Sequence, residues 1–122
     1  MAKILIIDDE LKLRETICEL LTFVGYDVHK ATNGIDGLTK VKKIKPDLIL
    51  CDITMPELDG YGFMEHHQNS EYSIIPVLLL SANVEFKNIK KGIALGAKGY
   101  IKKPFAFKEL KEIIESNLLT NK

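Results

Sequence analysis

Several features that would place this chain in a special class of protein are missing from its sequence. No apolar run approaches the roughly 18 residues that a membrane span requires. The short apolar run near the N-terminus ends in the acids Asp8, Asp9 and Glu10, unlike a signal peptide. The 17 basic and 17 acidic residues cancel, so the chain has no overall electrostatic attraction to nucleic acid or to an anionic membrane. We therefore expect neither a membrane span nor nucleic-acid binding.

Cysteine is also scarce, and nucleotide-binding motifs are absent. Cys18 and Cys51 are too far apart for a metal or redox motif, so we expect both to be small core residues in a reducing, cytoplasmic location. A G-x-G-x-x-G motif and a P-loop are missing, which argues against nucleotide binding. With 122 residues, 46% of them hydrophobic, the chain is long enough for one domain (1–122) with its own core.

Short continuous apolar runs predict the strands. Such runs are typical of strands that are buried on both faces of a parallel sheet. The runs are Lys3–Ile7, Asp47–Cys51, Ile74–Leu80 and Gly99–Ile101. A more polar run, Tyr26–Ala31, is typical of an edge strand.

Apolar residues at helical spacing occupy the segments between these runs. A first helix is predicted to end at Gly25 and carries Leu13, Ile17, Leu20, Leu21 and Val24 on its apolar face. A second helix is predicted to run from a cap at Asn33 to near Pro46, and its apolar face carries Ile35, Leu38, Val41 and Ile44. A third helix is predicted over Tyr61–Gln68. A fourth is predicted over Val84–Leu95, with Phe86, Ile89 and Ile93 facing the core. The last helix is predicted to carry Phe107, Leu110, Ile113, Ile114 and Leu118 on one apolar face. Fivefold alternation of strand and helix predicts the α/β class, a single doubly wound (βα)5 domain with a five-stranded parallel sheet.

Polar side chains gather directly after the predicted strands, where such sheets place their functional sites. The candidates are Asp8, Asp9 and Glu10 after the first strand, Asp52 after the third, Ser81 after the fourth and Lys103 after the fifth. Carboxylates packed together repel one another, and a cluster of them is stabilised by a cation such as Mg²⁺, which prefers oxygen ligands. A carboxylate nucleophile, a metal ion, and a lysine and a hydroxyl to hold oxygens are the minimum for phosphoryl transfer. The alternative is that Asp9 or Glu10 merely caps the following helix.

These residues resemble the receiver domains of two-component response regulators. The resemblance rests on four segments that occur in order and at matching separations: Asp8-Asp9, Asp52–Gly60 with its Met-Pro and Asp-Gly pairs, Ser81-Ala82 and Gly96–Phe105. It covers essentially the whole chain. The resemblance implies a fold like that of the chemotaxis regulators, with the flavodoxin-like strand order 2-1-3-4-5, and a cis bond before Pro104.

The resemblance also implies a phosphorylation site. Asp52 would take a phosphoryl group from a sensor histidine kinase or a histidine phosphotransfer protein. Mg²⁺ would be held by the side chains of Asp8, Asp9 and Asp52, Asp8 through water, and by the backbone carbonyl of Thr54. A domain of this kind is a signalling protein, which catalyses its own phosphorylation and a slow self-dephosphorylation, and is not a turnover enzyme.

A switch between two states is implied by the same resemblance. Lys103 and Ser81 would hold the acyl phosphate, Ser81 would move toward it, and Tyr100 would rotate inward into the space left behind. This movement would change the face formed by the fourth helix, fifth strand and fifth helix. A downstream protein or a fused output domain would bind there, without direct nucleic-acid binding by this domain.

Two other functions are compatible with an acidic cluster at the sheet edge, but the sequence disfavours both. A phosphatase that passes through an aspartyl phosphate needs a second aspartate two positions after the nucleophile, and Thr54 occupies that position. A degenerate receiver that binds partners without phosphorylation is disfavoured by the complete set of acids, Ser81 and Lys103. Thr54 and Asn83 are predicted to influence how fast water attacks the acyl phosphate.

Two groups of basic residues remain outside this set. His29, His66 and His67 are predicted to lie on the solvated surface. A strip of lysines is interpreted either as a solvated face or as a docking surface for an acidic partner segment: Lys87, Lys90, Lys91, Lys98 and Lys102. The strip is not evidence of DNA binding, because no DNA-reading motif accompanies it.

Overall fold

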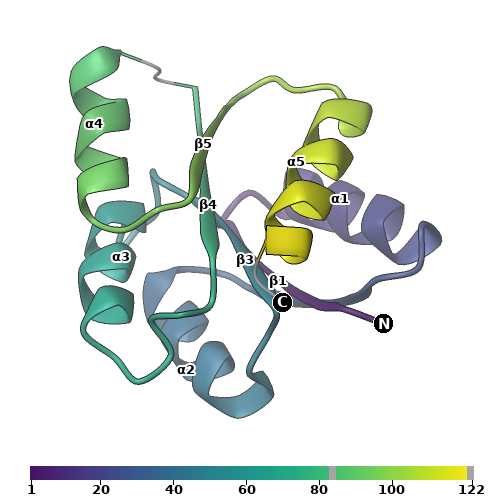
Figure 1. The fold of residues 1–122 in the computed structure, drawn as a ribbon, viewed down its shortest axis with the longest axis horizontal. Helices are drawn as coiled ribbons and strands as arrows, with labels where there is room; N and C mark the ends of the chain where they lie inside the picture. Colours follow the sequence, from purple (N-terminus) through teal and green to yellow (C-terminus); the bar gives the residue numbers. More distant parts are fainter. Residues whose placement is uncertain (83–84, 121–122) are drawn as a thin grey trace.

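Strands and helices alternate along the residues that the computed structural model describes, 1–82 and 85–120 (Figure 1). The strands are β1 (Lys3–Ile7), β2 (Asp27–Ala31), β3 (Leu48–Asp52), β4 (Val77–Ser81) and β5 (Gly99–Lys102). The helices are α1 (Leu11–Phe23), α2 (Gly34–Ile44), α3 (Gly60–Gln68), α4 (Phe86–Ala94) and α5 (Phe107–Thr120). All neighbouring strands are parallel, in the order β2-β1-β3-β4-β5. The predicted α/β fold, its strand order and its polar edge strand β2 are confirmed.

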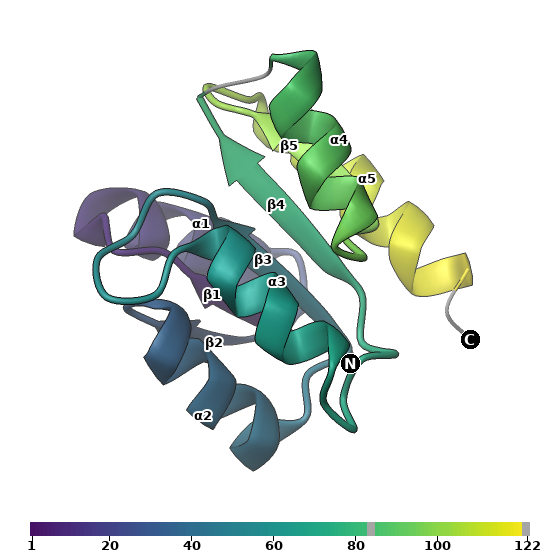
Figure 2. The ribbon, with the colours of Figure 1, turned by 90° about the vertical axis from the view of Figure 1, so that its left-hand side faces the viewer.

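Alternate side chains of each central strand enter two different cores. In β1, Leu5 and Ile7 pack on the side of α2 and α3, whereas Ile4 and Ile6 pack on the side of α1 and α5. Figure 2 shows α2, α3 and α4 on the near side of the sheet. Every residue of β3 and β4 is buried, which explains why these strands are apolar runs without alternation.

The predicted cap at Asn33 and the predicted helix stop at Gly25 are observed. The side chain of Asn33 accepts a hydrogen bond from the Asp36 backbone N–H at the start of α2. Gly25 and Gly96 follow α1 and α4 with φ angles of 105° and 102°, the left-handed conformation that favours glycine.

The predicted fourth strand began too early. Ile74 is 79% exposed, and β4 starts at Val77. The Ile75 backbone N–H donates to the Tyr72 carbonyl at 2.9 Å, so this segment is a turn and Ile74 is kept out of the sheet.

The predicted inward face of the fourth helix was also partly wrong. Helix α4 starts at Phe86, and Val84 lies outside the described residues. Phe86 and Ile93 are 78% and 47% exposed, whereas Gly92 is buried. A Cβ atom at Gly92 would lie 2.8 Å from Leu79 Cδ1, so α4 approaches the sheet closely at this glycine and turns Phe86 and Ile93 outward.

Other apolar residues of the predicted core are more exposed than their helical spacing indicated. Leu20 on α1, Val24 directly after α1, and Ile35 on α2 contact solvent. Cys51 is buried as predicted, but Cys18 is only half-buried. These positions lie at the margins of the buried helix faces, which spacing alone does not resolve.

His67 is buried, so the prediction that it lies on the surface was wrong. Its ring stacks on Phe63 with 5.6 Å between ring centroids. Residues 63 and 67 are one helical turn apart and therefore share the buried face of α3, while His66 is exposed. His29 is half-buried on β2.

No helix within the described residues combines the length and the apolar character that crossing a bilayer demands.

Candidate functional site

Three aspartates meet at the carboxyl edge of the sheet. Asp8 directly follows β1 and Asp52 is the last residue of β3, and these strands are paired, with Ile7 opposite Cys51. One carboxylate oxygen from each of Asp8, Asp9 and Asp52 lies within 4.8 Å of the others. Asp8 and Asp52 are buried, whereas Asp9 is exposed. The predicted convergence of these acids is thus present in the structure.

Lys103 reaches this cluster from the segment after β5. Its Nζ donates to Asp52 Oδ1 at 2.9 Å and to Asp8 Oδ2 at 3.4 Å. The Lys103–Pro104 bond is cis, as the resemblance implied. Lys103 therefore forms ion pairs with two of the three acids at the sheet edge.

Burial and like charge perturb both partners of this ion pair. Burial raises the pKa of Asp52, the hydrogen bond from Lys103 offsets this only in part, and the charge of Asp8 raises it further. Burial opposes the charge on Lys103, but its hydrogen bond to Asp52 and the charge of Asp8 outweigh burial, so the pKa of Lys103 is raised. One lysine does not neutralise three carboxylates, and excess negative charge remains.

The donor set fits a hard divalent cation. All the ligand atoms are carboxylate oxygens, two of the acids are buried, and the exposed Asp9 leaves room for water and substrate. Capping does not explain these acids. Glu10 occupies the N-cap position of α1 without a side-chain cap bond, and its backbone N–H instead donates to Asp8 Oδ1 at 2.9 Å.

Ser81 and Thr54 lie on the elements that border the cluster. Ser81 is the last residue of β4, is 6% exposed, and accepts a hydrogen bond at its backbone carbonyl from the Lys103 N–H at 2.9 Å. Thr54 is exposed in the loop after Asp52. Asn83, which we predicted to line the approach of water, lies outside the described residues.

The loop between Asp52 and α3 is held on several sides. The Gly60 backbone N–H donates to the Ile53 carbonyl at 2.8 Å, and a Cβ atom at Gly60 would lie 2.6 Å from the Asp52 carbonyl oxygen. The Gly34 N–H of α2 donates to the Leu58 carbonyl at 3.1 Å. These contacts place the loop beside Asp52.

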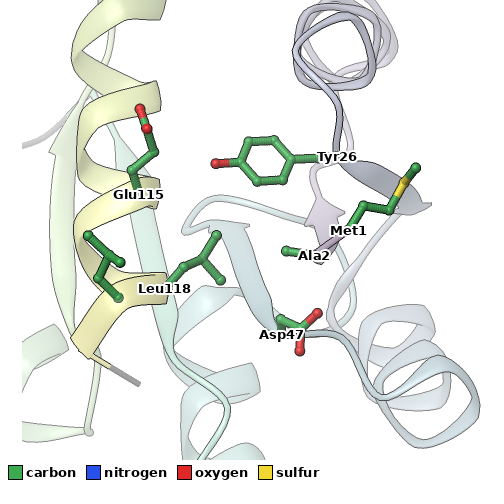
Figure 3. Close-up of a pocket in the computed structure, with 7 residues that line it drawn as sticks. Met1, Ala2, Tyr26, Asp47, Glu115 and Leu118 are labelled. Atoms are coloured by element: carbon green, nitrogen blue, oxygen red, sulfur yellow. The ribbon is translucent and has the colours of Figure 1, made fainter. Parts of the chain in front are cut away.

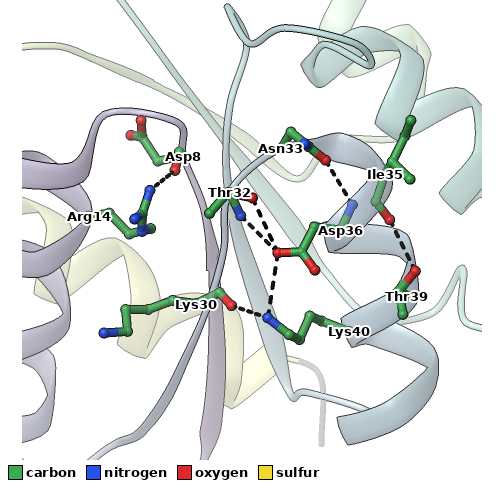
Figure 4. A network of polar contacts seen from close by, with 9 residues as sticks. All are labelled: Asp8, Arg14, Lys30, Thr32, Asn33, Ile35, Asp36, Thr39 and Lys40. Atoms are coloured by element: carbon green, nitrogen blue, oxygen red, sulfur yellow. Dashed lines mark hydrogen bonds and ion pairs between the residues drawn. The ribbon is translucent and has the colours of Figure 1, made fainter.

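The sequence reasoning missed Arg14, the single arginine of the chain. Its Nη1 donates to the backbone carbonyl of Asp8 at 2.7 Å, and Figure 4 shows the guanidinium aimed at the end of β1. The same figure shows a separate network, in which Asp36 Oδ2 accepts from the Thr32 N–H at 3.0 Å and lies 3.5 Å from Lys40 Nζ. Arg14 lies one turn into the helix after the acids, and this spacing could have identified it.

Tyr100 lies on β5, on the side of the sheet that α3 and α4 cover. Its hydroxyl is 3.4 Å from the Tyr61 hydroxyl, which donates to the Asn88 carbonyl at 3.2 Å. Lys91 Nζ lies 4.4 Å from the centroid of the Tyr61 ring. The predicted switch residue is thus connected to α4 through Tyr61, a connection that the sequence did not indicate.

A cavity of about 580 Å³ lies at the other end of the sheet (Figure 3). Ala2 and Asp47, which line it, directly precede β1 and β3. Its remaining lining residues are Met1, Tyr26, Glu115, Leu118 and Leu119. None of the predicted site residues is among them, so this cavity is not the candidate site.

Comparisons with known proteins agree with this arrangement. A family model described as "Response regulator receiver domain" matches residues 4–115. The "Probable transcriptional regulator ycf27" of Porphyridium aerugineum is 40% identical over 116 residues, which cover 95% of this chain and 48% of that protein. The chain therefore spans about half the length of the curated relatives that it matches.

Solved structures of similar fold include two that match nearly the whole chain. The chemotaxis protein CheY4 of Vibrio cholerae superposes with a TM-score of 0.90 at 32% identity, covering 95% of this chain and 98% of that one. The receiver domain of the Francisella response regulator 1452 gives a TM-score of 0.94 at 28% identity, with 100% of both chains covered.

Proposed function

Because the chain belongs to the response regulator receiver domain family of two-component systems, we propose that it accepts a phosphoryl group on Asp52 and thereby switches partner binding. The observation that carries this proposal is the cluster of Asp8, Asp9 and Asp52 with Lys103 at the carboxyl edge of the sheet. The donor would be a phosphohistidine on a sensor histidine kinase or on a histidine phosphotransfer protein. We propose a cytoplasmic location and assign this receiver role to residues 1–122 as one domain.

In the proposed reaction, a carboxylate oxygen of Asp52 attacks phosphorus. A new P–O bond forms as the P–N bond of the phosphohistidine breaks, and the bonding electrons stay on the imidazole nitrogen, which takes up a proton. Lys103 Nζ, which lies 2.9 Å from Asp52 Oδ1, is close enough to pair with an oxygen of the transferred group. The hydroxyl of Ser81 would donate to the same group. The domain would lose the group slowly by hydrolysis, so it would not act as a turnover phosphatase.

We assign the Mg²⁺ ligands to the carboxylates of Asp8, Asp9 and Asp52, with Asp8 binding through water, and to the backbone carbonyl of Thr54. When bound, the ion supplies charge neutralisation between these carboxylates and the incoming phosphoryl group. The net negative charge that remains after pairing with Lys103 supports this assignment.

Signal output follows from the contacts of Tyr100. Movement of Ser81 toward the phosphoryl group and inward rotation of Tyr100 would break the contact between the Tyr100 and Tyr61 hydroxyls. Since Tyr61 also bonds to Asn88 of α4, the face formed by α4, β5 and α5 would change with it. A downstream protein, or an output domain of the same polypeptide, would bind this face.

Incubation with acetyl phosphate and Mg²⁺, followed by mass spectrometry of the intact protein, tests the phosphoacceptor. We expect a single adduct with the mass of one phosphoryl group, absent from Asp52→Asn, while circular dichroism shows an unchanged fold. Full labelling of Asp52→Asn would place the acceptor elsewhere, and fast multiple turnover would indicate a phosphatase.

The role of Lys103 requires a second measurement. Lys103→Ala is expected to retain most Mg²⁺ affinity in calorimetry, and to lose the change in partner affinity that phosphorylation causes. Lys42→Ala, at an exposed position of α2, is the control. A normal phosphorylation-dependent affinity change in Lys103→Ala would contradict this role.

A further inference from the structure

Positive charge is concentrated in one segment of this electrically neutral chain. Residues 86–104 contain six lysines and no acid, which leaves 11 basic against 17 acidic residues elsewhere. The six are Lys87, Lys90, Lys91, Lys98, Lys102 and Lys103. Lys103 points into the aspartate cluster, and the other five are exposed. A solvated helix surface ordinarily mixes both signs of charge, so this segregation needs another explanation.

The five exposed lysines form one surface over α4 and β5. Side chains alternate along a strand, so Lys98 and Lys102 lie on the same side of β5 as Tyr100, which packs toward α4 near Gly92. β5 is an edge strand, so among the described residues no further strand pairs with its outer edge. In the described part of the chain, the side chains of Lys90, Lys98 and Lys102 have no ion-pair or hydrogen-bond partner.

Two large apolar side chains interrupt the positive charge. Phe86 is 78% exposed and Ile93 is 47% exposed. Residues 86, 90 and 93 are spaced four and three apart, so Phe86, Lys90 and Ile93 share one face of α4. We call these three residues, together with Lys87, Lys91, Lys98 and Lys102, the lysine-rich surface. Lys87 lies 3.9 Å from Glu85, so one of the lysines is partly neutralised. An exposed phenylalanine among lysines that are mostly without an acidic neighbour is nevertheless typical of an interaction site, not of a solvated face.

We propose that the lysine-rich surface binds an acidic segment of a partner protein, which sets an apolar side chain between Phe86 and Ile93 and carboxylates against the lysines. The proposal rests on the proposed function, since it names the class of partner for that output face. Charge complementarity is the first argument, because carboxylates would neutralise Lys90, Lys98 and Lys102, whose side chains have no ion-pair partner among the described residues. The apolar pair is the second, because its burial favours binding by a protein side chain.

A polynucleotide fits the same surface less well. Phosphates would neutralise the lysines but would leave Phe86 and Ile93 exposed. A long polyanion would also extend over the rest of the chain, where acids outnumber bases by 17 to 11. A short acidic segment contacts the lysine-rich surface alone.

Contacts beneath the surface connect it to the proposed switch. Lys91 lies over the ring of Tyr61, and Tyr61 bonds to Asn88 of α4 and contacts Tyr100. Rotation of Tyr100 would therefore change the position of α4 and the spacing of its lysines. We expect affinity for the acidic segment to rise when Asp52 is phosphorylated or carries beryllofluoride.

The test uses two synthetic peptides of equal length that differ only in charge. One is an amphipathic helix with leucines on one face and glutamates beside them, and the other has lysines in place of the glutamates. NMR titration of isotope-labelled protein, with Mg²⁺ and with or without beryllofluoride, is expected to shift signals from the lysine-rich surface with the acidic peptide only. Absence of binding by the acidic peptide in both states, or tighter binding of a DNA duplex, would overturn the proposal.

Variants separate this proposal from the proposed function. The double variant Lys90→Glu/Lys102→Glu is expected to reduce peptide affinity at least about tenfold, and Phe86→Ser to reduce it without changing charge. Lys42→Glu/Lys43→Glu, an equal charge change at exposed positions of α2, is the control. An equal loss in the control would contradict the assigned surface. Labelling of Asp52 by acetyl phosphate is expected to stay normal in all variants; its failure in the unsubstituted protein would contradict the proposed function instead.

Discussion

Burial determines what each polar side chain can do in this protein. Asp8 and Asp9 are adjacent in sequence, yet Asp8 is fully buried and Asp9 is exposed. The carboxylate of Asp8 accepts hydrogen bonds from Lys103 and from the Glu10 N–H. The carboxylate of Asp9 is accessible to an ion that enters from solvent. The same contrast distinguishes the buried His67 from the exposed His66 on α3.

His67 is expected to make stability depend on pH. Burial lowers its pKa, and the hydrogen bond to the Ile75 carbonyl opposes this only in part. That bond, 2.9 Å long, needs the proton on Nε2, and the buried Nδ1 has no partner among the described residues. Since the unfolded chain has the higher pKa, close to 6.5, it binds the proton first as the pH falls. The stability is thus complete above about pH 6.5 and declines below it.

Urea unfolding at about pH 7.5 and about pH 5.5 measures this effect. His67→Phe is expected to lose about 1 kcal/mol at the higher pH, through the missing hydrogen bond, and to lose less than the unsubstituted protein on acidification. His66→Gln, at the exposed neighbouring position, is the control. An unchanged pH dependence in His67→Phe would show that another group causes the decline.

Arg14 is expected to strengthen metal binding by holding the backbone of a metal ligand in place. Its hydrogen bond to the Asp8 carbonyl holds the backbone between Asp8 and Asp9. Arg14→Ala should weaken Mg²⁺ binding by roughly tenfold, as loss of an outer-shell partner commonly does, and Arg14→Lys should recover part of the affinity. Calorimetric titration with Mg²⁺ checks this, with Lys12→Ala on the exposed face of α1 as the control. Equal affinities for Arg14→Ala and the control would remove Arg14 from the site.

The position of helix α3 depends on a close approach between two backbone segments at Gly60. The loop from Asp52 enters α3 at Gly60, where a Cβ atom would lie 2.6 Å from the Asp52 carbonyl oxygen and 2.7 Å from Ile53 Cα. Neither backbone atom can move without displacing Asp52. The entry of α3 and the position of the phosphoacceptor are therefore coupled.

Gly60→Ala is expected to destabilise the protein by about 1–3 kcal/mol and to reduce labelling of Asp52, because the loop must shift. Gly62→Ala is the matched control, since its Cβ atom would meet the end of the flexible Leu58 side chain instead of backbone. Thermal unfolding and acetyl phosphate labelling measure both variants. A smaller effect of Gly60→Ala than of Gly62→Ala would contradict the coupling.

For the molecule as a whole, the acidic sheet edge is a source of instability that a cation would relieve. Asp52 lies more than 40 residues after the adjacent Asp8 and Asp9, so folding brings its charge next to theirs. A ligand that binds only the folded state adds to the free energy of unfolding, by about 2.7 kcal/mol at a hundred times its Kd. Mg²⁺ should therefore raise the melting temperature, and EDTA should reverse the rise.

Asp9→Ala should abolish most of this stabilisation, because it removes the exposed carboxylate of the cluster. Differential scanning calorimetry with and without Mg²⁺ measures the effect. Glu10→Ala, which alters an exposed acid beside the cluster, serves as the comparison. Equal Mg²⁺ responses in Asp9→Ala and in the unsubstituted protein would exclude Asp9 from the ligands.

Local patterns in the chain were sufficient to predict that five strands occur, the order of the elements and the acids at the sheet edge, although not the start of β4. Continuous apolar runs such as Leu48–Cys51 reflect burial on both faces, and strand ends place Asp8, Asp52 and Lys103 by topology alone. The inward face of α4 was not predictable in this way. Its orientation depends on Gly92, which lets the helix approach Leu79.

Contacts between side chains of different elements could not be predicted from local patterns either. The chain of contacts from Tyr100 through Tyr61 to α4 joins side chains of three separate elements, whose spacing in the sequence carries no periodic signal. Hydrophobic periodicity reports which face of an element is apolar, because it is a property of neighbours in sequence. It does not report how closely two elements approach or which polar groups meet, because packing across the sheet sets those distances.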